Sequence, residues 1–430
     1  MIGQLIPNYK GAVLIMEQIF TILPLLLLLY TWGKLKKTFS SPASILISTW
    51  CIILFLQAFM AADFKFYYET GFILQILIIS FFLGEVFILA NKKLSNKNIF
   101  WGNSIVEKNK KIFHKRLLNT IILFNSVALF GSVLYFYVFY NYFGSILNLL
   151  TAGWAIRGVL ADDLIQVPLI IRAMSLMSYT ALIFCLCYWI RFGFKWFLII
   201  PFLSMLIMNT AQAGRAGVLM MLISIFVAAY WRDKLNGDVA TNYRFVKRIF
   251  KFTLVIMLFF SFGLAYREQN FDISSFGYGQ LDSYRAYAFG AISGFAAFWK
   301  NYSISADLTY GIYSFSSLIE LLGIRKLPTG FYDTYLSISD IGNDETNIYT
   351  MFRSVIDDFG VIGSVIYMFL MGSVMAFYYS HAIKGNLAAL SFVIMSYTLL
   401  IYSVFAPLTQ HNTILVAFIL PPLIFVFFKK

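Results

Sequence analysis

Residues 44–61 read SILISTWCIILFLQAFMA, and residues 71–90 read GFILQILIISFFLGEVFILA. The first run holds no Asp, Glu, Lys or Arg, and the second holds only Glu85. Crossing about 30 Å of hydrocarbon, at about 1.5 Å per helical residue, takes roughly 17–25 mostly apolar residues. Both runs have that length, so each one predicts a transmembrane helix.

The whole chain shares this apolar character. Of its 430 residues, 60% are hydrophobic, 19% are aromatic and 12% are charged. Soluble domains carry roughly 45–50% apolar and about 25% charged residues, so this composition excludes a soluble enzyme, a disordered chain and a nucleic-acid-binding domain. The net charge of +13 comes mostly from short loops, as membrane orientation requires. Three cysteines exclude a disulfide framework and a Cys-based zinc site.

Hydropathy predicts an all-α polytopic membrane protein that forms a single integral membrane domain over residues 1–430. We expect about eleven transmembrane helices, within a range of roughly 10–14. The sixth and seventh are nearly continuous and predict a tight helical hairpin. The expected spans cover residues 12–32, 44–61, 71–90, 117–142, 166–190, 196–212, 215–231, 251–267, 354–379, 385–405 and 412–428.

Basic loops set the predicted orientation, because Lys and Arg concentrate on the cytoplasmic side of a membrane. The loop 91–116 holds eight basic residues against one acid, and the segment 232–250 is also basic. The opposite face then carries the hairpin tip at 213–214 and the large loop 268–353. Short interfacial helices are expected in this loop at about 283–299 and 306–323. An eleven-span count places the N-terminus outside.

Arginines on the outer face require an explanation, because arginine is costly there. Arg215 stands in the sequence AGRAG between two predicted spans, with no acid nearby in the sequence. A guanidinium at a helix N-terminus adds its charge to the backbone N–H groups and creates an anion site. Arg157, Arg285 and Arg353 are further candidates. The alternative for each is a lipid-headgroup anchor or an ion pair with a neighbouring acid.

A second polar cluster lies at the start of the ninth span, in the stretch 346–360. Arg353 and Asp357 are four residues apart and share one face of a helix, while Asn347 belongs to a second, polar face. Two adjacent carboxylates at the mouth of a span are costly unless one is paired and the other is exposed or protonated. Asp358 is therefore a candidate proton acceptor, and an Arg353–Asp357 ion pair is the structural alternative for its neighbour.

His411 is the second candidate proton acceptor, in a short polar turn on the outer face. The alternative is a loop histidine with ordinary hydrogen-bond partners. No spacing of His, Asp and Glu predicts a metal site, so we expect neither a metal nor a cofactor.

Three stretches together resemble bacterial oligosaccharide repeat-unit polymerases of the Wzy type. NTAQAGRAGVLMMLISIFVAAYW (209–231) resembles their Gly-Arg-Gly-type turn, and TNIYTMFRSVIDDFGVIGSVIYMFLMG (346–372) resembles the segment after their periplasmic loop. YRAYAFGAISGFAAF (284–298) is similar to a helix of that loop. Ala216 departs from the pattern, where a second glycine is common. The eleven-span count also departs from it.

The resemblance implies a metal-independent, inverting glycosyltransferase of the bacterial inner (cytoplasmic) membrane, with its active site facing the periplasm. Its partners would be a polyprenyl-diphosphate-linked oligosaccharide donor and acceptor, membrane lipid and a chain-length regulator protein, and no nucleic acid. The product would be O-antigen of lipopolysaccharide or a related surface polysaccharide. We expect the arginines to bind the diphosphate, and Asn347, Tyr349 and Tyr284 to bind sugar. Further aromatic candidates in the loop are Tyr278, Tyr287, Trp299 and Tyr302. The alternative for the loop aromatics is anchoring in the interfacial aromatic belt of the membrane.

Other classes remain open. An O-antigen ligase would share the leaving group, and a flippase or other transporter would share the lipid-linked substrate. Transporters usually show two related halves and charges at mid-membrane. This chain has one long loop and charges clustered at one face, which favours the transferase.

Overall fold

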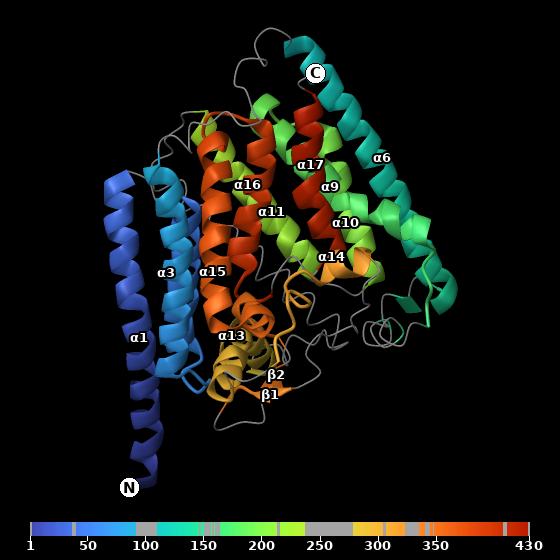
Figure 1. Ribbon diagram of the computed structural model, residues 1–430. Coiled ribbons are helices and arrows are strands. Elements are labelled where there is room, and N and C mark those ends of the chain that lie inside the picture. The colour runs from blue at the N-terminus through green and yellow to red at the C-terminus, as the bar shows by residue number, and fades with distance from the viewer. Residues whose placement is uncertain are drawn as a thin grey trace. The chain divides into compact units, whose positions relative to one another are not determined.

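Helices dominate the part of the chain that the computed structural model describes (Figure 1). In lipid no water can satisfy backbone N–H and C=O groups, and a helix pairs them within one segment. This is why the apolar runs become helices. The described residues are 2–36, 40–91, 110–145, 148–149, 156, 159, 164–212, 216–236, 278–303, 307–322, 335–339, 345–346, 348–406 and 411–428.

Seven helices in this part are long and apolar enough to span a membrane, as the sequence predicts for seven of its eleven spans. Each begins and ends within a few residues of the predicted run, except that α1 and α6 begin ten and seven residues earlier. They are α1 (Ile2–Lys36), α2 (Pro42–Met60), α3 (Tyr68–Ala90), α6 (Lys110–Phe143), α9 (Leu169–Phe192), α11 (Ala216–Leu235) and α15 (Met351–Ala382).

The other predicted spans are shorter helices or lie outside the described residues. The sixth span is the 3₁₀ helix η1 (Trp196–Ile199) followed by α10 (Ile200–Ala211), and the last two are α16 (Leu387–Tyr402) and α17 (Asn412–Phe427). The eighth, 251–267, is outside the described part. The total of eleven therefore stays a prediction.

Contacts divide the chain into two compact units, each assembled from separated segments. Unit 1 comprises Met1–Lys97, Leu281–Ser380 and Leu399–Gln410. Unit 2 comprises Asn98–Gln280, His381–Thr398 and His411–Lys430. The sequence predicts one domain over residues 1–430. Because the two units interleave along the chain, no linker marks a boundary between them.

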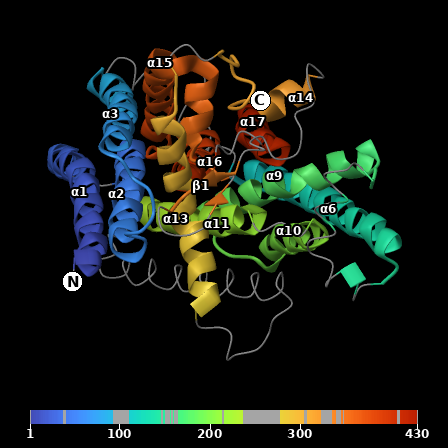
Figure 2. The ribbon, with the colours of Figure 1, turned by 90° about the horizontal axis from the view of Figure 1, so that it is seen from below.

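In unit 1, α1, α2, α3 and α15 run side by side, and α13 (Tyr278–Lys300) lies next to α2 at one end of this group (Figures 1 and 2). Gln57 on α2 donates a hydrogen bond to Ser293 Oγ on α13 at 2.9 Å. Beside α13, β1 (Leu336–Ser337) and β2 (Glu345–Thr346) form a short antiparallel pair. This end of unit 1 therefore gathers the loop after α2, the start of α3 and the start of α15.

Hydrophobic side chains attach α13 to this end of unit 1. Phe289 of α13 packs with Ala61, Phe64 and Ile338, and all four are buried. α13 covers the interfacial helix expected at 283–299. The helix expected at 306–323 is represented only by α14 (Ser316–Leu321), which is shorter.

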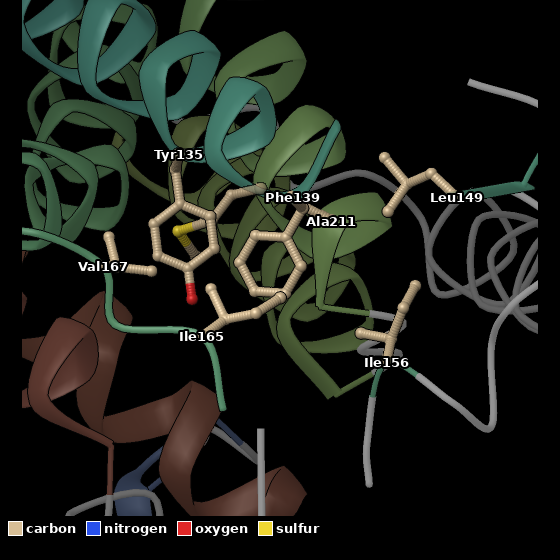
Figure 3. Packing of buried hydrophobic residues seen from close by; sticks show 8 residues of the cluster. Tyr135, Phe139, Leu149, Ile156, Ile165, Val167 and Ala211 are labelled. Carbon is tan, nitrogen blue, oxygen red and sulfur yellow. The ribbon is translucent and has the colours of Figure 1, made fainter. Parts of the chain in front are cut away.

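In unit 2, α9 is the central helix, since it contacts α6, α10, α11 and α17. One core lies where α6 and α10 end (Figure 3). Tyr135 and Phe139 of α6 stack with their ring centroids 5.3 Å apart, and Ile165 and Val167 pack against them. These contacts hold the stretch before α9 onto the helices.

Candidate functional site

The site is built around a break in α15. Gly360 has φ 65° and ψ −176°, so α15 consists of a short arm before it and a long arm after it. This backbone conformation is open to glycine and strained for other residues. The pair Asp357–Asp358, which the sequence singles out, stands immediately before the break.

Arg353 on the short arm is a buried cation, 8% exposed. Its guanidinium carbon lies 3.7 Å from the centroid of the Tyr349 ring and 4.7 Å from that of Phe298. Its Nε atom lies 3.5 Å from Asp357 Oδ2, which confirms that these two residues share a helix face. Stacking on aromatic rings fixes the plane of the guanidinium, and the carboxylate offsets part of its charge.

Tyr349, a predicted sugar-binding residue, is buried and supports Arg353. It is 3% exposed, and its hydroxyl donates a hydrogen bond to the carbonyl of Thr346 at 3.4 Å. Its ring face contacts the Arg353 guanidinium. The sugar-binding role expected for Tyr349 stays a prediction.

Asp358 is fully buried and holds a turn of the chain. Its Oδ1 accepts hydrogen bonds from the Thr309 hydroxyl at 2.5 Å and from the Tyr313 N–H at 3.0 Å. Its Oδ2 accepts a hydrogen bond from the Ser314 N–H at 2.5 Å. These three donors stabilise the charged carboxylate where it lies. The base role expected for Asp358 stays a prediction, and it would require this turn to open.

Arg285 has an acidic partner that lies far away in the sequence. It forms an ion pair with Asp63, in the loop after α2, and its guanidinium carbon lies 5.2 Å from the Phe64 ring centroid. The two charges are 222 residues apart, so the pair leaves no local signal in the sequence. This contact is the ion-pair alternative for Arg285, and it ties α13 to the end of α2.

A cavity of about 1040 Å³ opens beside the break in α15, within unit 1. It lies between α1, the start of α3, the end of α13 and the first turn of the long arm. Twelve described residues line it: Glu17, Tyr67, Glu69, Thr70, Trp299, Lys300, Tyr302, Leu308, Phe359, Gly360, Val361 and Ile362. The sequence marks Trp299, Tyr302 and the Phe359–Gly360 pair, but it gives no signal for Glu17 or Glu69.

Two pairs of side chains shape the wall formed by α13. Trp299 and Tyr302 stack nearly parallel, with ring centroids 5.2 Å apart and an angle of 12° between the rings. The Lys300 ammonium lies 4.5 Å from the Tyr67 ring centroid. Burial raises the pKa of the Tyr302 hydroxyl, and the nearby charge of Asp357 raises it further. The cavity therefore lies within electrostatic reach of the Arg353–Asp357 pair.

The opposite wall carries carboxylates and a buried hydroxyl. Glu17 is hydrogen bonded by the backbone N–H of Tyr68 and lies close enough to Glu69 to feel its charge. Thr70 is 0% exposed, and its hydroxyl makes no hydrogen bond to any residue in the described part of the chain. A buried hydroxyl is normally satisfied, so Thr70 is an exception among the described residues that line the cavity.

His411 belongs to unit 2 and precedes α17. Its carbonyl accepts hydrogen bonds from the N–H groups of Ile414 and Leu415 at 2.9 and 3.0 Å. Desolvation lowers the pKa of its imidazole below the usual 6.5, which keeps the ring neutral and able to accept a proton at pH 7. His411 stays a candidate base, in a different unit from Asp358.

Four candidates lie outside what the structure describes. Arg215, Arg157 and Asn347 are among the residues it leaves out, and for Tyr284 only the backbone in α13 is described. Their roles stay predictions. Among the described residues, no group of three or more His, Cys, Asp or Glu side chains could hold a metal ion.

Comparison of the chain with protein-family models, with curated proteins and with solved structures finds no match.

Proposed function

We propose that this protein is a glycosyltransferase that polymerises polyprenyl-diphosphate-linked oligosaccharide units at the extracytoplasmic face of a bacterial inner membrane. One observation carries the proposal: the short arm of α15 holds a buried, aromatic-supported arginine, and a cavity lies beside the break that ends this arm. Arg353 and Phe359 stand six residues apart on the short arm, about 9 Å along a helix. A cation and a cavity at this separation suit a substrate whose diphosphate binds the cation while its sugars occupy the cavity.

The leaving group explains the need for arginine. A hydroxyl oxygen of the acceptor sugar attacks the anomeric carbon of the donor, and the bond from that carbon to the diphosphate oxygen breaks. The lipid diphosphate leaves with the electron pair, and its charge is held by guanidinium groups, whose planar fork fits phosphate oxygens. Arg353 and Arg215 are assigned this part. Arg285 is assigned to hold α13 through Asp63.

The proton of the acceptor hydroxyl must pass to a base. Asp358 and His411 are the two candidates. Asp358 accepts hydrogen bonds from the turn at 309–314. Desolvation lowers the pKa of His411 and favours its neutral form. A neutral imidazole and an ionised carboxylate can each accept a proton. Asp358 and His411 therefore both stay candidate bases.

A gene-deletion strain tests the proposal at the level of the product. Loss of a polymerase leaves single repeat units on the surface lipid, whereas loss of a ligase leaves none attached and loss of a flippase leaves the units inside the cell. We expect single repeat units, and a long-chain ladder on re-expression. A surface lipid without any repeat unit would assign the chain to the ligase class and refute the polymerase.

Two substitutions test the diphosphate role in that strain. Arg215→Lys and Arg353→Lys keep the charge but lose the planar fork, so each should lower chain extension by roughly two to three decades at unchanged protein level. Arg191→Lys, at the exposed end of α9, is the matched control and should leave the ladder unchanged. Wild-type ladders from both test variants would remove the arginines from the mechanism.

A further inference from the structure

We infer that the cavity beside Gly360 binds neutral or amino-bearing sugar residues of the acceptor chain and excludes acidic sugars. The inference deepens the proposed function and rests on it for the natural ligand. The reaction itself requires neither a defined binding place for the glycan nor a selection of sugars by their charge. The inference adds both. Its volume of about 1040 Å³ stands at the upper end of the roughly 300–1,000 Å³ of small-ligand pockets.

The aromatic wall gives the cavity a platform for a sugar ring. Trp299 and Tyr302 lie nearly parallel, 5.2 Å between centroids, and both are only partly exposed. The C–H face of a pyranose packs against such a flat apolar surface, and nearby polar groups fix its orientation. A simple membrane anchor would need the aromatic pair alone. Here the pair shares a cavity with Glu17, Glu69 and Thr70.

The polar wall matches the hydroxyl groups of a sugar. Glu17 and Glu69 are acceptors, and the Thr70 hydroxyl, fully buried and without a hydrogen bond to any described residue, can donate or accept. A buried polar group left unpaired costs free energy, so a cavity that ends on one is adapted to a polar occupant. A hydrocarbon chain would leave Thr70 and both carboxylates unmatched.

Charge decides which sugars fit. Two carboxylates line the cavity against one ammonium, and that ammonium, on Lys300, already lies over the Tyr67 ring. An acidic sugar would meet the like charges of Glu17 and Glu69, and a neutral or amino-bearing sugar would not.

Binding of simple glycosides to the full chain in lipid nanodiscs tests the inference without any need for polymerisation. The probes are methyl glucoside, methyl glucosaminide and methyl glucuronide, measured by saturation-transfer NMR. We expect signals from the first two and a signal about tenfold weaker from the glucuronide, because of the like charges around it. Equal signals from all three probes, or none from any, would overturn the inference.

Variants locate the binding in this cavity. Trp299→Ala should reduce the glucoside signal to background, whereas Trp196→Ala, a residue 74% exposed and outside the cavity lining, should not change it. Glu69→Gln and Glu17→Gln together should bring the glucuronide signal close to that of glucoside; the glutamine at 17 keeps an oxygen for the Tyr68 N–H. Glu345→Gln, exposed on β2, is the matched control. A full signal from Trp299→Ala would place any binding elsewhere.

The outcomes for this inference and for the proposed function can be told apart. Selective glycoside binding combined with a deletion strain that polymerises normally would overturn the polymerase and keep the sugar cavity. A long-chain ladder from Trp299→Ala, with wild-type protein level, would overturn the sugar cavity and keep the polymerase.

Discussion

At the residue scale, the two adjacent aspartates have separate tasks because they face different neighbours. Asp357 pairs with Arg353 on its own helix face, while Asp358 turns away to accept three hydrogen bonds from the chain at 309–314. The spacing predicts the first contact, since four residues make about one turn. The second depends on a segment that lies 44–49 residues away.

Asp358→Asn should therefore lower stability as well as activity. The new amide group would point its N–H at one of the backbone N–H donors, which leaves a buried donor unmatched and costs about 1–3 kcal/mol. Thermal unfolding of the detergent-solubilised protein measures this cost. Asp307→Asn, at an exposed position before the same turn, is the control and should unfold like wild type. Lost polymer with unchanged unfolding would instead identify Asp358 as the base.

If His411 is the base, its lowered pKa predicts how the rate of polymerisation depends on pH. Its lowered pKa favours the neutral ring, so the rate should be flat above pH 6.5 and should fall only as the pH drops through the lowered value. His411→Ala should reduce the rate and abolish this acid limb, and His114→Ala should do neither. Rates of chain extension in membrane vesicles between pH 5 and 8, corrected for protein level, make the comparison. An unchanged acid limb in His411→Ala would exclude His411 as the titrating group.

At the element scale, glycines set the distance between α3 and α15. A Cβ atom on Gly84 would lie 2.0 Å from the Phe369 carbonyl oxygen, and one on Gly372 would lie 2.0 Å from the Phe81 carbonyl oxygen. Helices in lipid associate through such close backbone approach, because apolar burial gives them little advantage over lipid contact. Ser373 Oγ adds a hydrogen bond to the Gly84 carbonyl at 3.1 Å.

Gly372→Ala should push α3 and α15 apart. The methyl group meets backbone atoms that cannot rotate away, so we expect a loss of about 1–3 kcal/mol in stability, as in overpacked cores. Val374→Ala, at a site 48% exposed on the same helix, is the control and should have little effect. Unfolding midpoints of the purified proteins give the answer. A wild-type unfolding midpoint for Gly372→Ala would show that the close approach of α3 and α15 is not needed for stability.

At the scale of the whole molecule, the topology follows from charge asymmetry. Reporter fusions at Asn103 and Asn236 should be cytoplasmic, and a fusion at Asp340 should be extracytoplasmic, because basic loops stay on the cytoplasmic side. Dual activity reporters, one active on each side of the membrane, make the assignment. An extracytoplasmic signal at Asn103 would invert the map and move the cavity and Arg353 to the cytoplasmic face.

Local sequence is enough to predict the seven long apolar helices. A run such as 71–90 must pair its backbone groups internally in lipid, whatever surrounds it, so length and hydropathy suffice to predict α3. The same local reasoning predicts the Arg353–Asp357 pair, because both residues lie on one helix. It also marks the aromatic residues near 299, although it cannot tell a cavity wall from a membrane anchor.

What these helices enclose depends on how they pack against one another. Asp63 and Arg285 are 222 residues apart, and the cavity takes Glu17 from α1, Thr70 from α3 and Trp299 from α13. Contacts between helices leave no periodic trace in a sequence, since any apolar face suits both lipid and protein. The partners of a buried charge are therefore visible only once the helices have packed around it.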